Sequence, residues 1–90
     1  MVRIELTPDL SHCIETVARK EYENLVRGYL QDGKTDSDFE NKVELLRSFL
    51  ESADFRKLRK QSEEHLLKGQ NIKFVLYREG GKAKHKILRS

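Results

Sequence analysis

The N-terminal end of the chain alternates apolar and polar residues, a spacing that places every second side chain on the same face of a strand. Val2, Ile4 and Leu6 are apolar, and the residues between them are charged. This period of two predicts a short, half-buried strand over residues 2–6.

A β-hairpin is predicted at the other end of the chain. Two stretches with the composition of strands, about 71–78 and 82–89, flank a Gly-Gly pair. Two glycines in succession favour a type I′ turn, since that turn needs a positive φ at both central residues. The turn also fixes the register of the two strands, and this register places Tyr77 opposite Lys84.

Between these ends, the apolar residues follow the 3.6-residue period of amphipathic helices. Three helices are predicted, at about residues 8–31, 38–52 and 53–68. We expect the first to begin just after Thr7, because a hydroxyl cap, a proline and an acidic residue in succession suit a helix start. Gly33 is expected to end it in a left-handed conformation.

Caps and a change of face separate the second helix from the third. Ser37 and Glu40 have the spacing of a capping box. If this helix continued to residue 68, Phe55 and Leu58 would lie on the wrong face. A break near Ser52, with Ser52 as the cap, restores a single apolar face for the third helix, formed by Phe55, Leu58, Ser62 and Leu66.

The elements follow the order β-α-α-α-β-β, which predicts an α+β fold in a single domain over residues 1–90. We expect three helices on one face of a small antiparallel sheet that is built around the C-terminal hairpin. The N-terminal strand is expected at the edge of this sheet. The hairpin residues expected to face the helices are Ile72, Phe74, Leu76, His85 and Ile87.

The first predicted helix changes its apolar face halfway along. Its early stripe comprises Leu10, Cys13, Ile14, Val17 and Ala18. Glu21 lies where this stripe would continue, and we expect it to pair with a basic residue such as Arg59 or to face solvent. The later stripe is expected to meet either a second element of the same chain or a second subunit, and its candidate interface residues are Tyr22, Val26, Tyr29 and Leu30.

Composition narrows the classes of protein to which the chain can belong. No apolar stretch in its 90 residues approaches the roughly 20 residues that a membrane-spanning helix needs, and its first residues lack the apolar segment of a signal peptide. Cys13 is the only cysteine, so no internal disulfide can form, which fits a reducing cytoplasm. We therefore expect a cytoplasmic protein and exclude a membrane protein, a disulfide scaffold and a large multidomain enzyme.

The net charge of +3 conceals an asymmetry between two parts of the chain. Residues 1–54 hold 7 Lys and Arg against 12 Asp and Glu, a net charge of −5, whereas residues 55–90 hold 11 against 3, a net charge of +8. Such an asymmetry predicts a polyanionic partner or head-to-tail association between copies. Alternatively, the two parts lie against each other in the fold and neutralise each other.

The outer face of the predicted hairpin is the strongest candidate for a binding site. Lysines on this face can neutralise phosphates, and a tyrosine among them can stack against a base or a ribose. Alternatively, the lysines only protect an exposed sheet from aggregation. The candidate residues for contact with nucleic acid or another polyanion are Lys73, Tyr77, Lys82, Lys84 and Lys86.

A second basic set lies on the third predicted helix. Arg56, Lys57 and Lys60 share its outer face, and we include them among the candidate residues for binding an anion. The alternative is an ordinary solvated helix face with ion pairs at i,i+4 spacing, such as Arg59 with Glu63.

The sequence contains no motif that indicates an enzyme. It has no phosphate-binding glycine loop and no nucleophile motif. His12, His65 and His85 lack the spacing of metal ligands, and Cys13 is expected in the core. We therefore expect no catalytic residue, no metal and no cofactor. The alternative is an enzyme that lacks a known motif, and it would need a pocket where His12, Glu15 or His85 converge.

These patterns together predict a small cytoplasmic binding module without enzymatic activity. We expect it to contact nucleic-acid phosphates through the lysine-rich hairpin face. The alternative is a protein-interaction or self-associating module, a homo-oligomer that uses the later stripe of the first helix.

Overall fold

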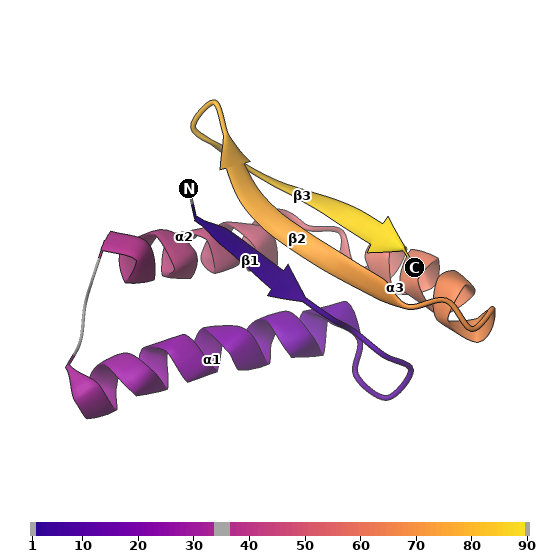
Figure 1. Ribbon diagram of the computed structural model, residues 1–90, viewed down its shortest axis with the longest axis horizontal. Helices are drawn as coiled ribbons and strands as arrows, with labels where there is room; N and C mark the ends of the chain where they lie inside the picture. Colours follow the sequence, from indigo (N-terminus) through magenta and orange to yellow (C-terminus); the bar gives the residue numbers. More distant parts are fainter. Residues whose placement is uncertain (1, 34–36, 90) are drawn as a thin grey trace.

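The computed structural model describes residues 2–33 and 37–89, without the side chains of Asp32 and Ser37 (Figure 1). Within these residues the strands form one antiparallel sheet in the order β1-β2-β3. The fold is therefore of the α+β class that the sequence predicts. The elements are β1 (Arg3–Leu6), α1 (Ile14–Asp32), α2 (Ser37–Ser52), α3 (Phe55–Leu67), β2 (Ile72–Glu79) and β3 (Lys82–Arg89).

One face of the sheet packs against the helices and forms the core. Phe74 and Leu76 of the central strand β2 are buried there together with Leu46 of α2 and Leu58 of α3. Ile14 and Ala18 of α1 are also buried in this core, and Val17 packs against it. The sheet therefore has an inner face toward the helices and an outer face whose side chains point the other way, because successive residues of a strand alternate between faces.

The hairpin has the turn and the register that the sequence predicts. Gly80 and Gly81 have φ angles of 60° and 77°, the positive values that a type I′ turn requires. Tyr77 pairs with Lys84 across the two strands, and Leu76 pairs with His85. The inner and outer faces of the hairpin are consequently those expected from the sequence.

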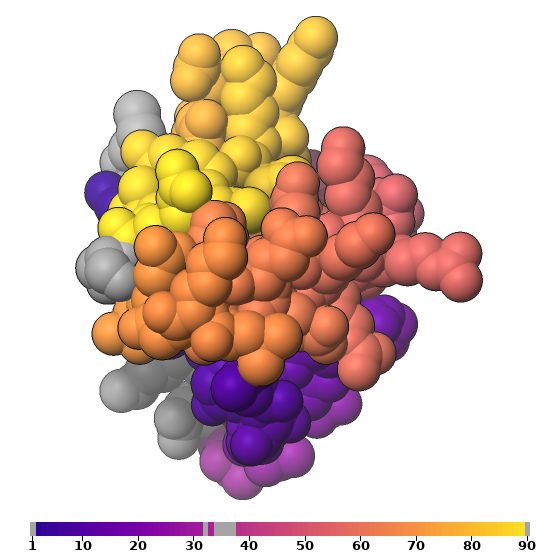
Figure 2. Space-filling view, turned by 90° about the vertical axis from the view of Figure 1, so that its right-hand side faces the viewer, coloured from indigo at the N-terminus to yellow at the C-terminus, as the bar shows by residue number. Residues whose placement is uncertain are grey.

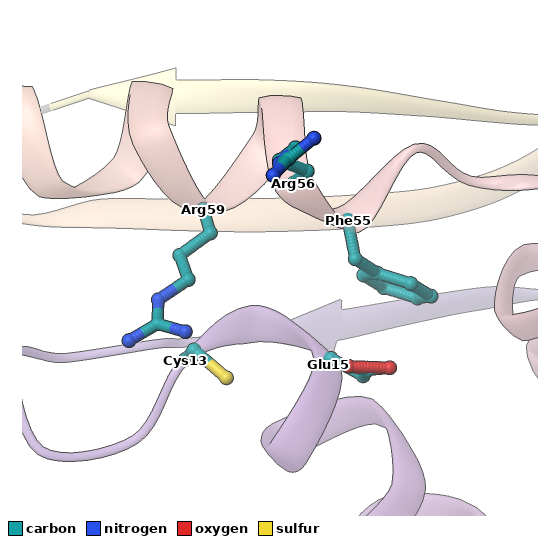
Figure 3. A pocket seen from close by; sticks show the side chains of 5 residues that line it. All are labelled: Cys13, Glu15, Phe55, Arg56 and Arg59. Carbon is teal, nitrogen blue, oxygen red and sulfur yellow. The ribbon is translucent and has the colours of Figure 1, made fainter.

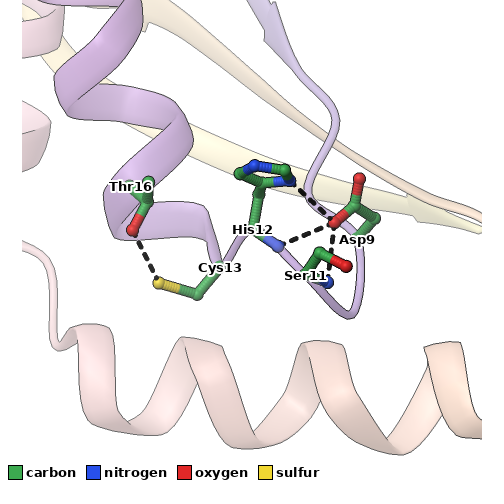
Figure 4. Close-up of polar contacts among 5 residues, drawn as sticks. All are labelled: Asp9, Ser11, His12, Cys13 and Thr16. Atoms are coloured by element: carbon green, nitrogen blue, oxygen red, sulfur yellow. Dashed lines mark hydrogen bonds and ion pairs between the residues drawn. The ribbon is translucent and has the colours of Figure 1, made fainter.

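The predicted start of the first helix is wrong, because α1 begins at Ile14 and not near residue 8. The carboxylate of Asp9 accepts hydrogen bonds from the backbone N–H groups of Ser11 and His12, at 2.8 and 2.7 Å (Figure 4). A backbone bond from Asp9 N–H to the carbonyl of His12 closes the same turn. This local turn competes with the helix for the backbone groups, and its hydrogen bonds hold the pKa of the Asp9 carboxyl below its usual value.

The later start of α1 corrects the placement of two residues that were expected on its apolar stripe. Leu10 lies in the loop before the helix and is 62% exposed. Cys13 is the cap residue of α1 and is half-buried, so the prediction of a core cysteine is wrong. The buried part of the stripe consists of Ile14 and Ala18.

The break between α2 and α3 is confirmed, but its cap is a different residue. Asp54, and not Ser52, caps α3 by accepting a hydrogen bond from the backbone N–H of Lys57. Ser52 is still part of α2, where its hydroxyl donates to the carbonyl of Ser48. The capping box predicted at Ser37 rests on a side chain outside the described residues.

The second half of α1 packs mainly against α2 of the same chain. The Tyr29 ring stacks on Phe39 with 5.3 Å between ring centroids, and Tyr22 packs against the core. Leu30 is 74% exposed. Arg59 pairs with Glu63 at 3.2 Å, which is the ion pair expected if the outer face of the third helix is an ordinary solvated face. The pair between Arg59 and Glu21 that the sequence suggested is not formed.

Two glycine substitutions test whether the hairpin turn depends on its positive φ. An added Cβ meets no atom within 4 Å at either Gly81 or Gly28, so packing does not distinguish the two sites. We expect Gly81→Ala to lower the free energy of unfolding by about 1–3 kcal/mol, because alanine is strained at positive φ. Gly28→Ala, within α1, is expected to raise it by about 0.5–1 kcal/mol. Urea denaturation measures both, and equal effects of the two variants would contradict this account.

Candidate functional site

The outer face of the sheet gathers side chains from all three strands. Arg3 of β1 lies opposite Tyr77 of β2, and Tyr77 lies opposite Lys84 of β3. These three residues form one row across the sheet, with the aromatic ring between two cations. Strands in a sheet lie about 4.8 Å apart, so this row is narrow enough for one ligand to contact all three side chains.

A third cation contributes to the surroundings of Tyr77. The ammonium group of Lys86 lies 5.6 Å from the centre of the Tyr77 ring, a distance at which the negative face of the ring attracts a cation. Tyr77 itself is half-buried. The ring therefore lies on the outer face of the sheet, among Arg3, Lys84 and Lys86.

Val75 is an apolar residue that is buried on the outer face. It occupies the middle of this face, opposite Glu5 on one side and Lys86 on the other, and yet only 1% of its surface is exposed. Long side chains cover apolar neighbours with their alkyl parts while their charged ends stay in water. We infer that the alkyl parts of the flanking residues close over Val75, which leaves their charged groups at the surface.

The outer face carries a positive excess that its acidic residues only partly offset. Glu5 pairs with Arg3 at 3.3 Å and with Lys73 at 3.4 Å, and Glu79 pairs with Lys84 at 3.7 Å. All of these side chains are well exposed, so the pairs contribute little to stability and yield readily to another anion. The alternation of the strands places on this face the cations Arg3, Lys73, Lys82, Lys84 and Lys86 and the acids Glu5 and Glu79.

A shallow hollow lies at the end of the sheet, next to the outer face. It has a volume of about 280 Å³ and is bordered by Lys73 and Leu88, with Ile72 and Thr7 beside them. Leu88 is 43% exposed, and it pairs with Lys73 across β2 and β3. An apolar side chain is thus available next to the lysines, two rows away from Tyr77.

The second predicted basic set lies in another layer of the molecule. Arg56, Lys57 and Lys60 are exposed on α3, whereas Leu58 and Ser62 of the same helix are buried. In the end-on view of Figure 2, α3 (salmon to orange) extends to the right while β3 (yellow) lies at the upper left. The two basic sets therefore lie on different elements, one on α3 and the other on the strands of the sheet.

A separate cleft opens between α3 and the start of α1. It has a volume of about 230 Å³, and Cys13, Phe55 and Arg59 are among its lining residues (Figure 3). Figure 3 shows the Arg59 side chain reaching from α3 toward the loop that contains Cys13. The hydrogen bond from the Thr16 hydroxyl, with 3.3 Å between Sγ and Oγ1, is the main cause that lowers the pKa of the Cys13 thiol. This cysteine is therefore more acidic than an ordinary one.

The residues considered for a catalytic pocket have separate neighbours. His12 pairs with Asp9 in the loop before α1 at 3.2 Å, Glu15 pairs with Arg19, and the ring of His85 packs edge-on against Phe49 of α2. Across residues 2–33 and 37–89, no three His, Cys, Asp or Glu side chains are grouped so as to hold a metal ion. No helix in the described part of the chain has the length and apolarity needed to cross a membrane.

Comparison with known proteins places the chain in a family. A family model matches residues 1–88. The chain belongs to this family. An uncharacterized protein of Archaeoglobus fulgidus is 44% identical over 52 residues, a match that covers 56% of this chain and 61% of the length of the relative. No solved structure matches the chain.

Sequence reasoning missed the contribution of β1 to the outer face. Arg3 and Glu5 alternate with the buried Ile4 and Leu6, which was a sufficient signal that they point away from the core. Their position beside Tyr77 depends on the register between β1 and β2. No turn joins these two strands, so the local sequence does not set this register.

The hydrogen bond between Cys13 and Thr16 makes a testable prediction about thiol reactivity. We expect Thr16→Val to raise the pKa of the Cys13 thiol toward its usual value, because the variant lacks the hydroxyl that stabilises the thiolate. The rate of alkylation by iodoacetamide, measured against pH, reports this pKa. Thr16→Ser, which keeps the hydroxyl, serves as the control, and an unchanged profile in Thr16→Val would contradict the assignment.

Proposed function

We propose that the protein is a binding module, without enzymatic activity, that contacts nucleic-acid phosphates through the outer face of its sheet. The observation that supports this most is the row Arg3, Tyr77 and Lys84, with Lys86 beside the ring. Cations neutralise phosphates, and an aromatic ring among them offers a surface for a base or a sugar. The free Cys13 thiol fits a reducing compartment, and we propose that the module acts in the cytoplasm.

The charge of the face suits a ligand with several regularly spaced anions. Its carboxylates are exposed partners of exposed cations, so phosphates can replace them at little cost in free energy. Counterions released from the nucleic acid then contribute to the affinity. A single small anion would gain from only one or two of these cations, whereas a polyanion gains from all of them.

Self-association is the second candidate function, and exposed apolar residues at the end of α1 favour it. Leu30 is 74% exposed and Tyr29 is 41% exposed. However, the Tyr29 ring already stacks on Phe39 of α2, so part of the stripe is used within the chain. Pairing between copies through β3 is unfavourable, because it would bring the lysines of two edge strands together.

Two matched double variants test the proposed interface. We expect the double variant Lys84→Gln with Lys86→Gln to weaken binding to an oligonucleotide. The slope of log affinity against log salt is expected to become shallower by about 1.4, because each phosphate contact on a single strand contributes about 0.7 to it. Lys57→Gln with Lys60→Gln removes the same charge from α3 and is expected to change the salt dependence little. Fluorescence anisotropy over a salt titration measures both.

Equal losses in the two double variants would contradict the proposed face, because binding would then follow the total charge alone. Affinity that does not fall as salt rises would contradict phosphate contact altogether. If the oligonucleotide does not bind even at low salt and the chain sediments as a dimer, self-association replaces nucleic-acid binding as the function.

A further inference from the structure

We infer that the ligand of the outer face is single-stranded nucleic acid, with its backbone along β3 and one base stacked on Tyr77. The inference rests on the proposed function and adds the class of nucleic acid. Three features of the outer face support it: a line of lysines along β3, an aromatic ring one strand inward from that line, and an apolar hollow at the end of the face.

The first feature is the line of lysines along the edge of the sheet. Lys82, Lys84 and Lys86 alternate along β3 and point to the outer face. Alternate residues of a strand lie about 6.6 Å apart, so the three lysine side chains leave β3 at regular intervals. Lys84 now pairs with Glu79 and Lys86 lies over Tyr77, and both exposed side chains can turn toward a row of phosphates along β3. One extended phosphate backbone can follow this line of lysines, whereas the two backbones of a duplex would need a second line.

The second feature is the position of the aromatic ring. Tyr77 lies on β2, immediately inward from Lys84, on the side toward which the bases of a strand following β3 would extend. A base of a single strand has a free face for stacking, whereas both faces of a base within a duplex are covered by its neighbours. The Lys86 ammonium group that now lies over the ring is flexible and exposed, and it can move to a phosphate when a base takes its place.

The third feature is the hollow beside Leu88. It lies at the end of the sheet, where Lys73 and Leu88 of the outer face border it together with Ile72 and Arg89. Lys73 lies four positions before Tyr77 on β2, which is about 13 Å along the strand. The face thus offers two places for bases, an aromatic ring and an apolar hollow, on one side of the lysine line. Neither contact reads the edge of a base, so we expect little sequence preference.

The test compares a fluorescein-labelled oligothymidine of about 12 nucleotides with its duplex, both at about 50 mM salt. We expect the single strand to bind more tightly than the duplex. Tyr77→Leu is expected to weaken binding of the single strand about tenfold, the effect of losing one stacked base, and to leave duplex binding nearly unchanged. Tyr77→Phe keeps the ring and is the matched control, with affinity for the single strand close to that of the original chain.

Tyrosine fluorescence provides a second readout that needs no destabilising variant. The chain has no tryptophan and three tyrosines, so its emission comes from tyrosine. We expect the oligothymidine to quench part of this emission, because a base stacks on Tyr77. The quenching is expected to disappear in Tyr77→Phe, although that variant still binds.

The outcomes separate this inference from the proposed function. If neither the single strand nor the duplex binds, the proposed function fails. If both bind equally, or if Tyr77→Leu and the original chain bind the single strand equally, then the face contacts phosphates but the assignment to single-stranded nucleic acid is wrong. Binding of the single strand without tyrosine quenching also overturns the stacking on Tyr77.

Discussion

The positive φ angles of Gly80 and Gly81 are the constraint on which the rest of the structure depends. They allow a two-residue turn, and that turn fixes which residue of β2 lies opposite which residue of β3. A shift of one residue would exchange the faces of a strand. It would place either Lys84 and Lys86 of β3 against the helices or Leu76 of β2 in solvent. The same turn therefore produces both the core and the basic outer face.

The central strand β2 connects the core on one face of the sheet with the candidate site on the other. Phe74 and Leu76 are buried beneath the helices, and Arg78 at the end of the strand pairs with Glu44 of α2 at 3.0 Å. This central strand carries Tyr77 on its other face, between Arg3 and Lys84. The strand β2 is paired with β1 and β3 and packs against the helices. The candidate site is therefore built on a rigid element, which favours binding without rearrangement.

The sequence predicted those features that local interactions determine. The hairpin and its register follow from two glycines, and the break before α3 follows from the change of apolar face near Ser52. The start of α1 was missed, because Thr7, Pro8 and Asp9 in succession suit a helix start. Only the folded chain shows that the Asp9 carboxylate closes a tight turn instead. Arg3 was missed as a neighbour of Tyr77 because its register is set by packing across the whole domain.

The central claim is that one face of the sheet, and not α3 or the end of α1, contacts nucleic acid. A titration of the isotope-labelled protein with a short single-stranded oligonucleotide, followed by backbone amide NMR, tests it most directly. The account predicts the largest shift changes at Arg3, Tyr77 and Lys84, in the three strands of the outer face. Changes concentrated at residues 56–60 of α3, or at Tyr29 and Leu30 of α1, would contradict it.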